Sequence, residues 1–263
     1  MERARIPLGV LLALVLWFGG RSCHAATLAI CAEPEPPPWI YWQRDGAGRP
    51  TKILAGFTVE LVTKVFQRIG VDIVIRPEPW MRCRQSLLSH KADFSFDAYP
   101  DDFPQELYVL SRHYNSLTTK VFFDAMHPVE ASRASDLKSY RGCGLSGSSY
   151  KSFHLEDKDL DLDAKDDAML VRKLFAGRCD YFIEDLEVMA GNRLGGQDFL
   201  SDPRLRGLDI PDAKPGTLHI VAKRGTRAAA MMPAIDKAIT ALIESGEAAM
   251  IWKKHAGSIV FKP

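Results

Sequence analysis

Carboxylate side chains stand at the ends of two short apolar runs that predict β-strands. Asp97 ends the run 92–97, and Asp185 follows the run 179–183. In open α/β sheets, ligands bind beyond the carboxyl ends of the strands, so both carboxylates are candidate ligand contacts. The competing interpretations are a turn at Asp97 and a cap of the following helix at Asp185.

Two other segments could bind a ligand by different chemistry. Ser148 and Ser149 follow Gly147 in a small-residue turn before a predicted helix, and such a turn is a ready anion site. Trp39 ends a run of prolines after the first predicted strand, 27–32, where it could present its aromatic face to a ligand. Core packing is the alternative for Trp39.

Catalysis and metal binding find no support in the sequence. The histidines are scattered, and none can be paired with a nucleophile. No CxxC or HxxxH spacing occurs, which argues against a metal. The acidic run 156–167 lacks the spacing and central glycine of a calcium loop, and we expect a solvated loop that leads into a helix. We therefore expect no catalytic residue, no metal and no cofactor.

The first 25 residues have the layout of a cleavable secretory signal. Arginines near the start precede the apolar run 6–18, and a cut before Ala26 places Cys23 and Ala25 at the positions that favour small residues. The run is shorter than the roughly 20 apolar residues that span a membrane. We do not expect a lipid anchor on Cys23, because residues 20–22 lack the aliphatic residue that should precede it.

The net charge of the chain gives no indication of a nucleic-acid partner. The whole chain has a formal net charge of +1, and removal of the signal, with its three arginines and one glutamate, takes the charge to −1. A nearly neutral chain offers no electrostatic basis for binding nucleic acid.

The segment 56–99 predicts a helix, a strand, a helix and a strand in turn. Its first helix is indicated by apolar residues at helical spacing, which are Phe57, Leu61, Val62, Val65, Phe66 and Ile69. Gly70 ends that helix. A strand at 71–76, a helix at 80–90 and the strand 92–97 follow. Strands that alternate with helices predict a parallel sheet.

The same alternation restarts after an extended crossing segment, 117–123. We expect strands at 141–145 and 179–183 around a helix at 167–175, a second crossing strand at 218–223, and a helical tail broken near Gly246. The chain should therefore form two α/β lobes: 26–118 with 219–263, and 119–218.

With these elements in place, the mature chain resembles the bacterial periplasmic solute-binding proteins of family 3, the polar amino-acid-binding type that serves ABC transporters. The resemblance rests on short motifs in the family's order, namely Pro37-Pro38-Trp39, Gly56-Phe57-Glu60-Leu61, Pro79-Trp80, Lys91-Ala92-Asp93, Ser111 with Tyr114, Gly147-Ser148-Ser149-Tyr150, Ala176 to Asp180, and Gly246 with Ile251 to Lys254.

The resemblance implies a type II periplasmic-binding-protein fold, in which two lobes of mostly parallel sheet and flanking helices close on a ligand by a hinge. It also implies a periplasmic monomer without enzymatic activity that passes a small polar ligand to an inner-membrane ABC permease.

By position, the resemblance nominates ligand contacts on both lobes: Trp39, Asp97, Tyr99, Ser148, Ser149 and Asp185. Trp80 and Arg82 are further candidate contacts. Trp39 would pack on the ligand, Ser148 and Ser149 would donate hydrogen bonds to its carboxylate, and Asp185 would hold its amino group. Core packing is an equal alternative for Trp80, and a solvated helix position is the ordinary one for Arg82.

One departure from the family concerns the arginine that grips an α-carboxylate as a bidentate clamp. That position holds Pro104 or Gln105, depending on the residue from which it is counted. Arg82 and Arg112 are the nearby substitutes, and Arg82 is the better one. The sequence therefore predicts the fold more firmly than it predicts amino-acid binding.

Two other functions remain open on the same fold. One is an enzyme of the cyclohexadienyl dehydratase type, in which Glu184 would act as a general acid or base. The other is an accessory or sensor protein that binds a ligand without a transporter.

The mature chain has four cysteines, which allow three pairings in an oxidising compartment. The two-lobe arrangement favours Cys31–Cys83 and Cys143–Cys179, one disulfide within each lobe.

Overall fold

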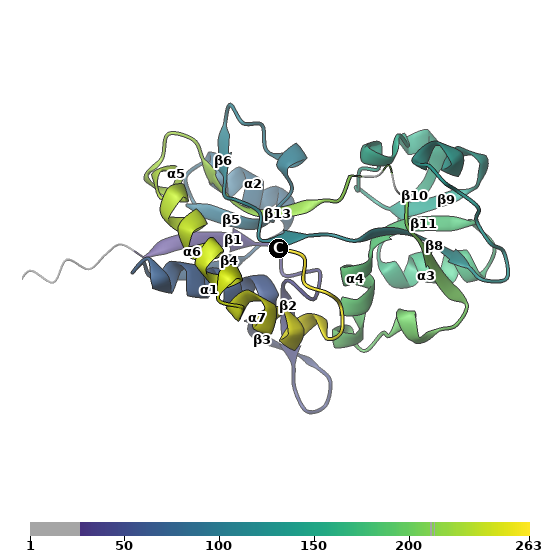
Figure 1. Ribbon diagram of the computed structural model, residues 1–263, viewed down its shortest axis with the longest axis horizontal. Helices are drawn as coiled ribbons and strands as arrows, with labels where there is room; N and C mark the ends of the chain where they lie inside the picture. Colours follow the sequence, from purple (N-terminus) through teal and green to yellow (C-terminus); the bar gives the residue numbers. More distant parts are fainter. Residues whose placement is uncertain (1–26, 211, 213) are drawn as a thin grey trace, which may run out of the picture.

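The computed structural model describes residues 27–210, 212 and 214–263, so the predicted signal peptide lies outside the described residues. The chain forms two α/β lobes connected by extended segments (Figure 1). Among the described residues, no helix is both long enough and apolar enough to cross a membrane.

The first lobe is built on a sheet in the order β4-β1-β5-β13-β6, with β7 paired to β13. Its strands are β1 (Leu28–Ala32), β4 (Ile73–Pro77), β5 (Phe94–Ala98), β6 (Tyr108–Leu110), β7 (Asn115–Ser116) and β13 (Thr217–Lys223). β1 runs parallel to β4 and β5, whereas β13 runs antiparallel to β5. A hairpin of β2 (Tyr41–Arg44) and β3 (Pro50–Ala55) is attached.

Helices cover this sheet, and they are α1 (Phe57–Arg68), α2 (Trp80–Leu88), α5 (Arg227–Ala230), α6 (Met232–Glu244) and α7 (Glu247–Ala256). The apolar residues of α1 are buried at helical spacing, as the sequence predicts. The predicted break in the helical tail is real, because Gly246 adopts φ 78° between α6 and α7.

The second lobe has the sheet order β10-β9-β11-β8-β12. Its strands are β8 (Thr119–Asp124), β9 (Gly142–Leu145), β10 (Leu160–Ala164), β11 (Tyr181–Asp185) and β12 (Leu205–Leu208), and its helices are α3 (Asp167–Phe175) and α4 (Leu186–Gly191). β9 runs parallel to β10 and β11, and β8 runs antiparallel to β11. The short 3₁₀ helices are η1 (Pro100–Asp102), η2 (Ala134–Ser139), η3 (Lys151–Phe153), η4 (Asp157–Asp159), η5 (Asn192–Gly195) and η6 (Phe199–Ser201).

The acidic run 156–167 is not the solvated loop expected from sequence. It contains β10, and Asp161 and Asp163 of that strand both form ion pairs with Lys173, whose side chain is only 4% exposed. The carboxylates neutralise a lysine that α3 places against the sheet.

The chain crosses between the lobes at the starts of β8 and β13 (Figure 1). Helix α4 also connects them, because its Val188 packs in the apolar core of the first lobe. The lobe limits drawn from the sequence stay a prediction.

Each lobe contains one disulfide. Cys31–Cys83 joins β1 to α2, and Cys143–Cys179 joins β9 to the segment before β11. These are the pairs expected from the two-lobe arrangement.

Candidate functional site

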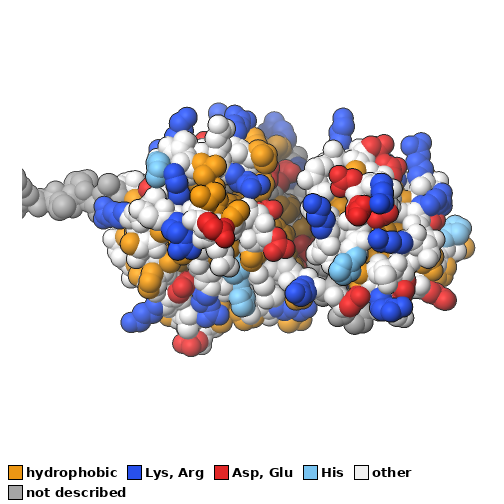
Figure 2. All heavy atoms as spheres, turned by 90° about the horizontal axis from the view of Figure 1, so that it is seen from above, with side chains coloured by type: hydrophobic (Ala, Val, Ile, Leu, Met, Phe, Trp, Pro, Cys, Tyr) orange, Lys and Arg blue, Asp and Glu red, His pale blue; other side chains and the backbone are white. Residues whose placement is uncertain are grey.

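A hollow lies between the two lobes, and acidic side chains lie along it (Figure 2). β5 of the first lobe leads to Tyr99, and β11 of the second lobe ends at Asp185. Although 39% of the surface of Tyr99 is exposed, burial of its hydroxyl raises the pKa well above 10, and the negative charges of Asp185 and Glu184 raise it further. The charges of the second lobe thus act on the hydroxyl of a first-lobe tyrosine.

Asp185 is 8% exposed and ends β11 of the second lobe. The Thr119 hydroxyl donates a hydrogen bond of 2.6 Å to its Oδ1. Burial raises the pKa of Asp185 to about 6, while hydrogen bonding by Thr119 and Tyr99 opposes the rise. The Asp185 side chain makes no capping hydrogen bond to α4, so the helix-cap interpretation is wrong.

Asp97 is held by the interior of the first lobe. Its Oδ1 accepts hydrogen bonds from the Thr58 hydroxyl at 2.7 Å and from the Tyr114 hydroxyl at 2.8 Å. The other oxygen, Oδ2, is buried and has no hydrogen-bond partner among the described residues. Burial raises the pKa of Asp97 to about 7. The backbone of Asp97 has φ 55°, which is uncommon for a residue other than glycine.

Glu184 and Asp167 bring two more carboxylates to the second-lobe side. Glu184 accepts a hydrogen bond of 2.8 Å from the backbone N–H of Asp185. Burial raises its pKa well above 4.5, and the charges of Asp167 and Asp185 add to the rise. Asp167 accepts a hydrogen bond of 2.7 Å from the Asn192 amide, and its Oδ1 is buried without a partner among the described residues.

From the sequence, Glu184 was proposed only as a general acid or base in the enzyme alternative. Asp167 was not proposed as a site residue. Asp167 stands at the end of the acidic run, where no sequence signal separates it from its neighbours. Burial raises its pKa, and the charge of Glu35 in the first lobe contributes to the rise.

These four carboxylates have no cationic partner within the described part of the chain. Neither Asp97, Asp167, Glu184 nor Asp185 lies within 4.0 Å of a lysine, arginine or histidine nitrogen there. Within the described residues, no ion pair therefore neutralises any of the four carboxyl groups.

Trp39 does not lie in the hollow, which corrects the role expected for it. Its side chain is 2% exposed, its indole N–H donates a hydrogen bond of 2.8 Å to Asn115, and its ring centroid lies 6.1 Å from that of Trp252. The backbone carbonyls of Pro38 and Trp39 accept hydrogen bonds from the start of α1, and the indole packs in the core beneath them.

Trp80 and Arg82 both lie in the first turn of α2, which follows the carboxyl end of β4. Trp80 is half-buried and packs edge-on against Phe103, with the ring centroids 5.6 Å apart. Arg82 is exposed and forms no hydrogen bond or ion pair with its side chain in the described structure.

Arg112, the other substitute for the missing clamp, does not serve the hollow. Its guanidinium donates a hydrogen bond of 2.7 Å to Thr240 on α6. Pro104 and Gln105 are exposed and bring no positive charge. Neither Arg112 nor the residues at the clamp position therefore supply a free guanidinium for a carboxylate.

Ser148 and Ser149 are exposed in the turn after β9. The predicted helix does not follow them, because the next element is the three-residue η3. The helix N-terminus invoked for an anion site is thus absent at this turn, although the two hydroxyls remain at the carboxyl end of β9.

A cavity of about 280 Å³ lies at the carboxyl ends of β1 and β4. It is lined by Glu33, Pro34, Glu35, Trp42, Pro77, Glu78 and Pro79.

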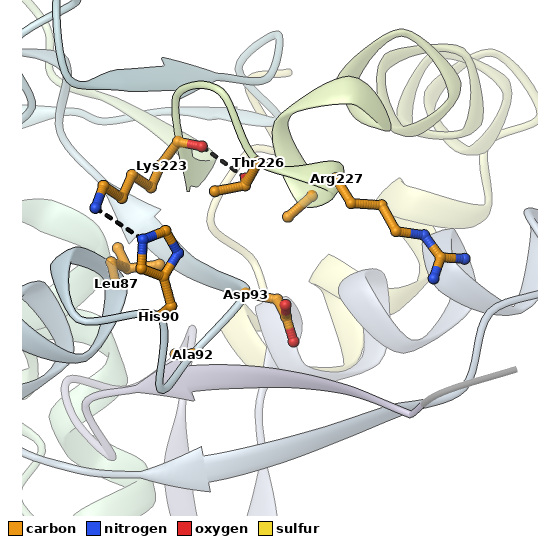
Figure 3. Close-up of a pocket in the computed structure, with 8 residues that line it drawn as sticks. Leu87, His90, Ala92, Asp93, Lys223, Thr226 and Arg227 are labelled. Carbon is orange, nitrogen blue, oxygen red and sulfur yellow. Dashed lines mark hydrogen bonds between the residues drawn. The ribbon is translucent and has the colours of Figure 1, made fainter.

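A much smaller cavity, of about 60 Å³, lies near the amino end of β5 (Figure 3). There Lys223 Nζ lies 3.0 Å from His90 Nε2. This second cavity is at the opposite edge of the sheet and is not part of the candidate site.

The described residues contain no group of three or more histidine, cysteine or acidic side chains arranged to hold a metal ion.

Residues 28–258 match the family model of the bacterial extracellular solute-binding proteins, family 3. No curated protein sequence matches the chain.

Solved structures share the fold at low sequence identity. The amino acid ABC transporter substrate-binding protein AbpA from Streptococcus pneumoniae, bound to L-arginine, is 20% identical with a TM-score of 0.67, over 87% of this chain and 93% of its own. The arginine-, lysine-, histidine-binding protein ArtJ from Geobacillus stearothermophilus is 18% identical with a TM-score of 0.67, over 89% and 96%. A histidine kinase sensor domain is also 18% identical with a TM-score of 0.67, over 90% and 99%.

Proposed function

The chain belongs to the bacterial extracellular solute-binding proteins of family 3, and from this premise we propose that it captures a small polar ligand between its two lobes. We further propose that the protein works in the periplasm and delivers the ligand to an ABC permease. Similar structures named as substrate-binding proteins of amino acid transporters support this role.

The observation that carries the proposal is the meeting of polar groups from both lobes at one place. Tyr99 comes from the first lobe, and Glu184 and Asp185 come from the second, and their charges and hydroxyls influence one another. A ligand that contacts both sides stabilises the closed arrangement, because only such contacts differ between the open and closed states.

In this mechanism, the strand ends supply the ligand contacts. Asp97 is fixed by Thr58 and Tyr114, and Asp185 is fixed by Thr119. Ser148 and Ser149 remain candidate contacts at the rim. Trp80 and Arg82, in the first turn of α2, also remain candidate contacts. Trp39 supports the wall from inside the core and is no longer proposed as a contact.

A thermal-shift screen tests the proposal. The panel contains amino acids, amines and organic acids, and a specific ligand raises the melting temperature by mass action. Small-angle scattering with the best ligand should then show a smaller radius of gyration, which is expected from lobe closure. The proposal fails if no member of the panel raises the melting temperature.

One observation favours an enzyme as a second candidate. Burial keeps the pKa of Glu184 well above 4.5, so this carboxyl group is suited to act as a general acid. Turnover of prephenate or arogenate that is lost in Glu184→Gln would establish the enzyme. Absence of turnover leaves the binding function.

A further inference from the structure

We propose that the cleft binds a small organic cation that has no carboxylate group, such as an alkyl amine or a guanidine. The cation would lie between Asp97 of the first lobe and Asp167, Glu184 and Asp185 of the second. The inference rests on the proposed ligand-binding function and names the chemical class of its ligand.

Two buried oxygens without partners are the first line of evidence. Asp97 Oδ2 and Asp167 Oδ1 are both inaccessible to solvent and accept no hydrogen bond from any described residue. A buried acceptor without a hydrogen bond destabilises the folded protein, and more so when it is charged. An ammonium or guanidinium group supplies several N–H donors together with the missing positive charge. Because the two oxygens belong to opposite lobes, a cation that satisfies both favours closure.

Buried acids elsewhere in the protein provide an internal comparison. Asp124 is 3% exposed and forms an ion pair with Arg204. Glu187 is 1% exposed and accepts hydrogen bonds from the N–H and hydroxyl of Thr118 at 2.9 and 2.7 Å. Lys262 donates to the same Thr118 hydroxyl at 2.8 Å. Asp124 and Glu187 thus have hydrogen-bond or ion-pair partners within the protein. The carboxyl groups of the cleft lack an ion-pair partner among the described residues, and a ligand could supply one.

The surroundings disfavour a carboxylate on the ligand. An incoming carboxylate would meet the second-lobe acids, where the charges of Asp167 and Asp185 already raise the pKa of Glu184, and like charges in a poorly solvated site repel each other. Arg112 is bound to Thr240. Arg82 is exposed on α2 and contributes to none of the pKa shifts of the cleft acids. The amino group of a zwitterionic amino acid would therefore be attracted to the site, but its carboxylate would be repelled.

The cavity of about 280 Å³ gives the apolar body of such a cation a place to lie. Three prolines and Trp42 form apolar walls, and Glu33, Glu35 and Glu78 add further negative charge. A cation near the face of a tryptophan is attracted to the ring. Glu35 of this cavity belongs to the proline turn, which packs against α4 at Gly191, next to Asn192, the residue that donates a hydrogen bond to Asp167.

Matched ligand pairs test the inference. Agmatine differs from L-arginine, and cadaverine from L-lysine, by the α-carboxylate alone. In titration calorimetry at about pH 8, we expect at least one of these amines to bind at least about tenfold more tightly than its amino acid. The inference is overturned if the amino acids bind as tightly as the amines or more tightly. If amino acids or organic acids bind and amines do not, only the inference fails. If nothing in the wider screen binds, the proposed function fails with it.

Substitutions test the named contacts with the better amine. Asp97→Asn and Asp167→Asn should each weaken its binding at least about tenfold without lowering the melting temperature of the unliganded protein. The exposed control Glu106→Gln should leave the affinity unchanged. Unchanged affinity in both aspartate variants would overturn the inference.

Discussion

Tyr99, directly after β5 of the first lobe, and Asp185, at the end of β11 of the second lobe, influence each other's pKa. The charge of Asp185 raises the pKa of the tyrosine hydroxyl, and that hydroxyl opposes the burial-driven rise in the pKa of Asp185. Thr119, at the start of the crossing strand β8, donates to the same carboxylate. The cleft is thus connected directly to the segment about which the lobes would turn.

The Tyr99 hydroxyl should contribute to ligand binding because it lies beside the acids of the opposite lobe. We expect Tyr99→Phe to weaken the affinity for the best ligand about fivefold, which corresponds to one hydrogen bond of about 1 kcal/mol. Titration calorimetry measures the loss. Tyr140→Phe is the matched control, since that hydroxyl bonds Glu130 elsewhere in the second lobe. Equal affinities in both variants and in the wild type would exclude this role.

The buried carboxylate of Asp97 should make the unliganded protein less stable at higher pH. Its pKa in the folded state is about 7, above the ordinary 3.8, so ionisation is penalised in the folded state. The free energy of unfolding should fall as pH rises through the interval between these values. Asp97→Asn should remove this loss and stabilise the protein by about 1–4 kcal/mol at about pH 8.

His219 acts in the opposite direction, because burial lowers its pKa and stability is lost when it must be protonated at lower pH. The informative measurement is therefore the difference in unfolding free energy between wild type and Asp97→Asn, from urea denaturation at about pH 5 and about pH 8. A difference that does not grow with pH would contradict the assignment.

Trp39 should act on stability and not on ligand recognition. Trp39→Phe removes the hydrogen bond to Asn115 and leaves space beside Trp252, so the unfolding free energy should fall by about 2–4 kcal/mol. The affinity of the folded protein should stay within about twofold of wild type. Denaturation and calorimetry on the same sample separate the two effects. A stable protein with weakened binding would instead restore Trp39 as a ligand contact.

The helices and strands could be predicted because the spacing of apolar residues and the β-branched composition agree with the packing of the folded protein. The apolar spacing from Phe57 to Phe66 gives α1 its buried face, and the short β-branched segment at 71–76 becomes β4. The acidic run was misjudged because its alternation with Leu160 and Leu162 is the pattern of a strand, and its many charges suggested a loop.

The site was only partly predictable. Asp185 and Tyr99 could be found because they follow strands, and strand ends gather at one edge of a sheet. Asp167 could not, because its burial depends on Asn192 and on the first lobe, which no local pattern reveals. Trp39 was wrongly predicted to contact the ligand, because a proline-rich turn does not determine which way the next side chain points.

Close packing between the lobes at α4 should limit how they approach. A β-carbon at Gly191 would lie 2.3 Å from the carbonyl oxygen of Pro37, so Gly191→Ala must displace α4 from the proline turn. We expect a larger radius of gyration in solution and a ligand affinity at least about fivefold weaker. Gly195→Ala is the control, because its β-carbon would meet only Arg44 at 3.7 Å. Identical scattering and affinity in both variants would contradict this contact.

The most direct test of a cation-binding cleft is a calorimetric titration of agmatine into wild-type protein and into Asp185→Asn. The substitution keeps the size of the side chain and an acceptor for Thr119 but removes the charge. We predict saturable binding to the wild type and at least about tenfold weaker binding to Asp185→Asn, with no decrease in melting temperature. Equal affinity of the two proteins for agmatine would contradict ligand capture by this carboxylate.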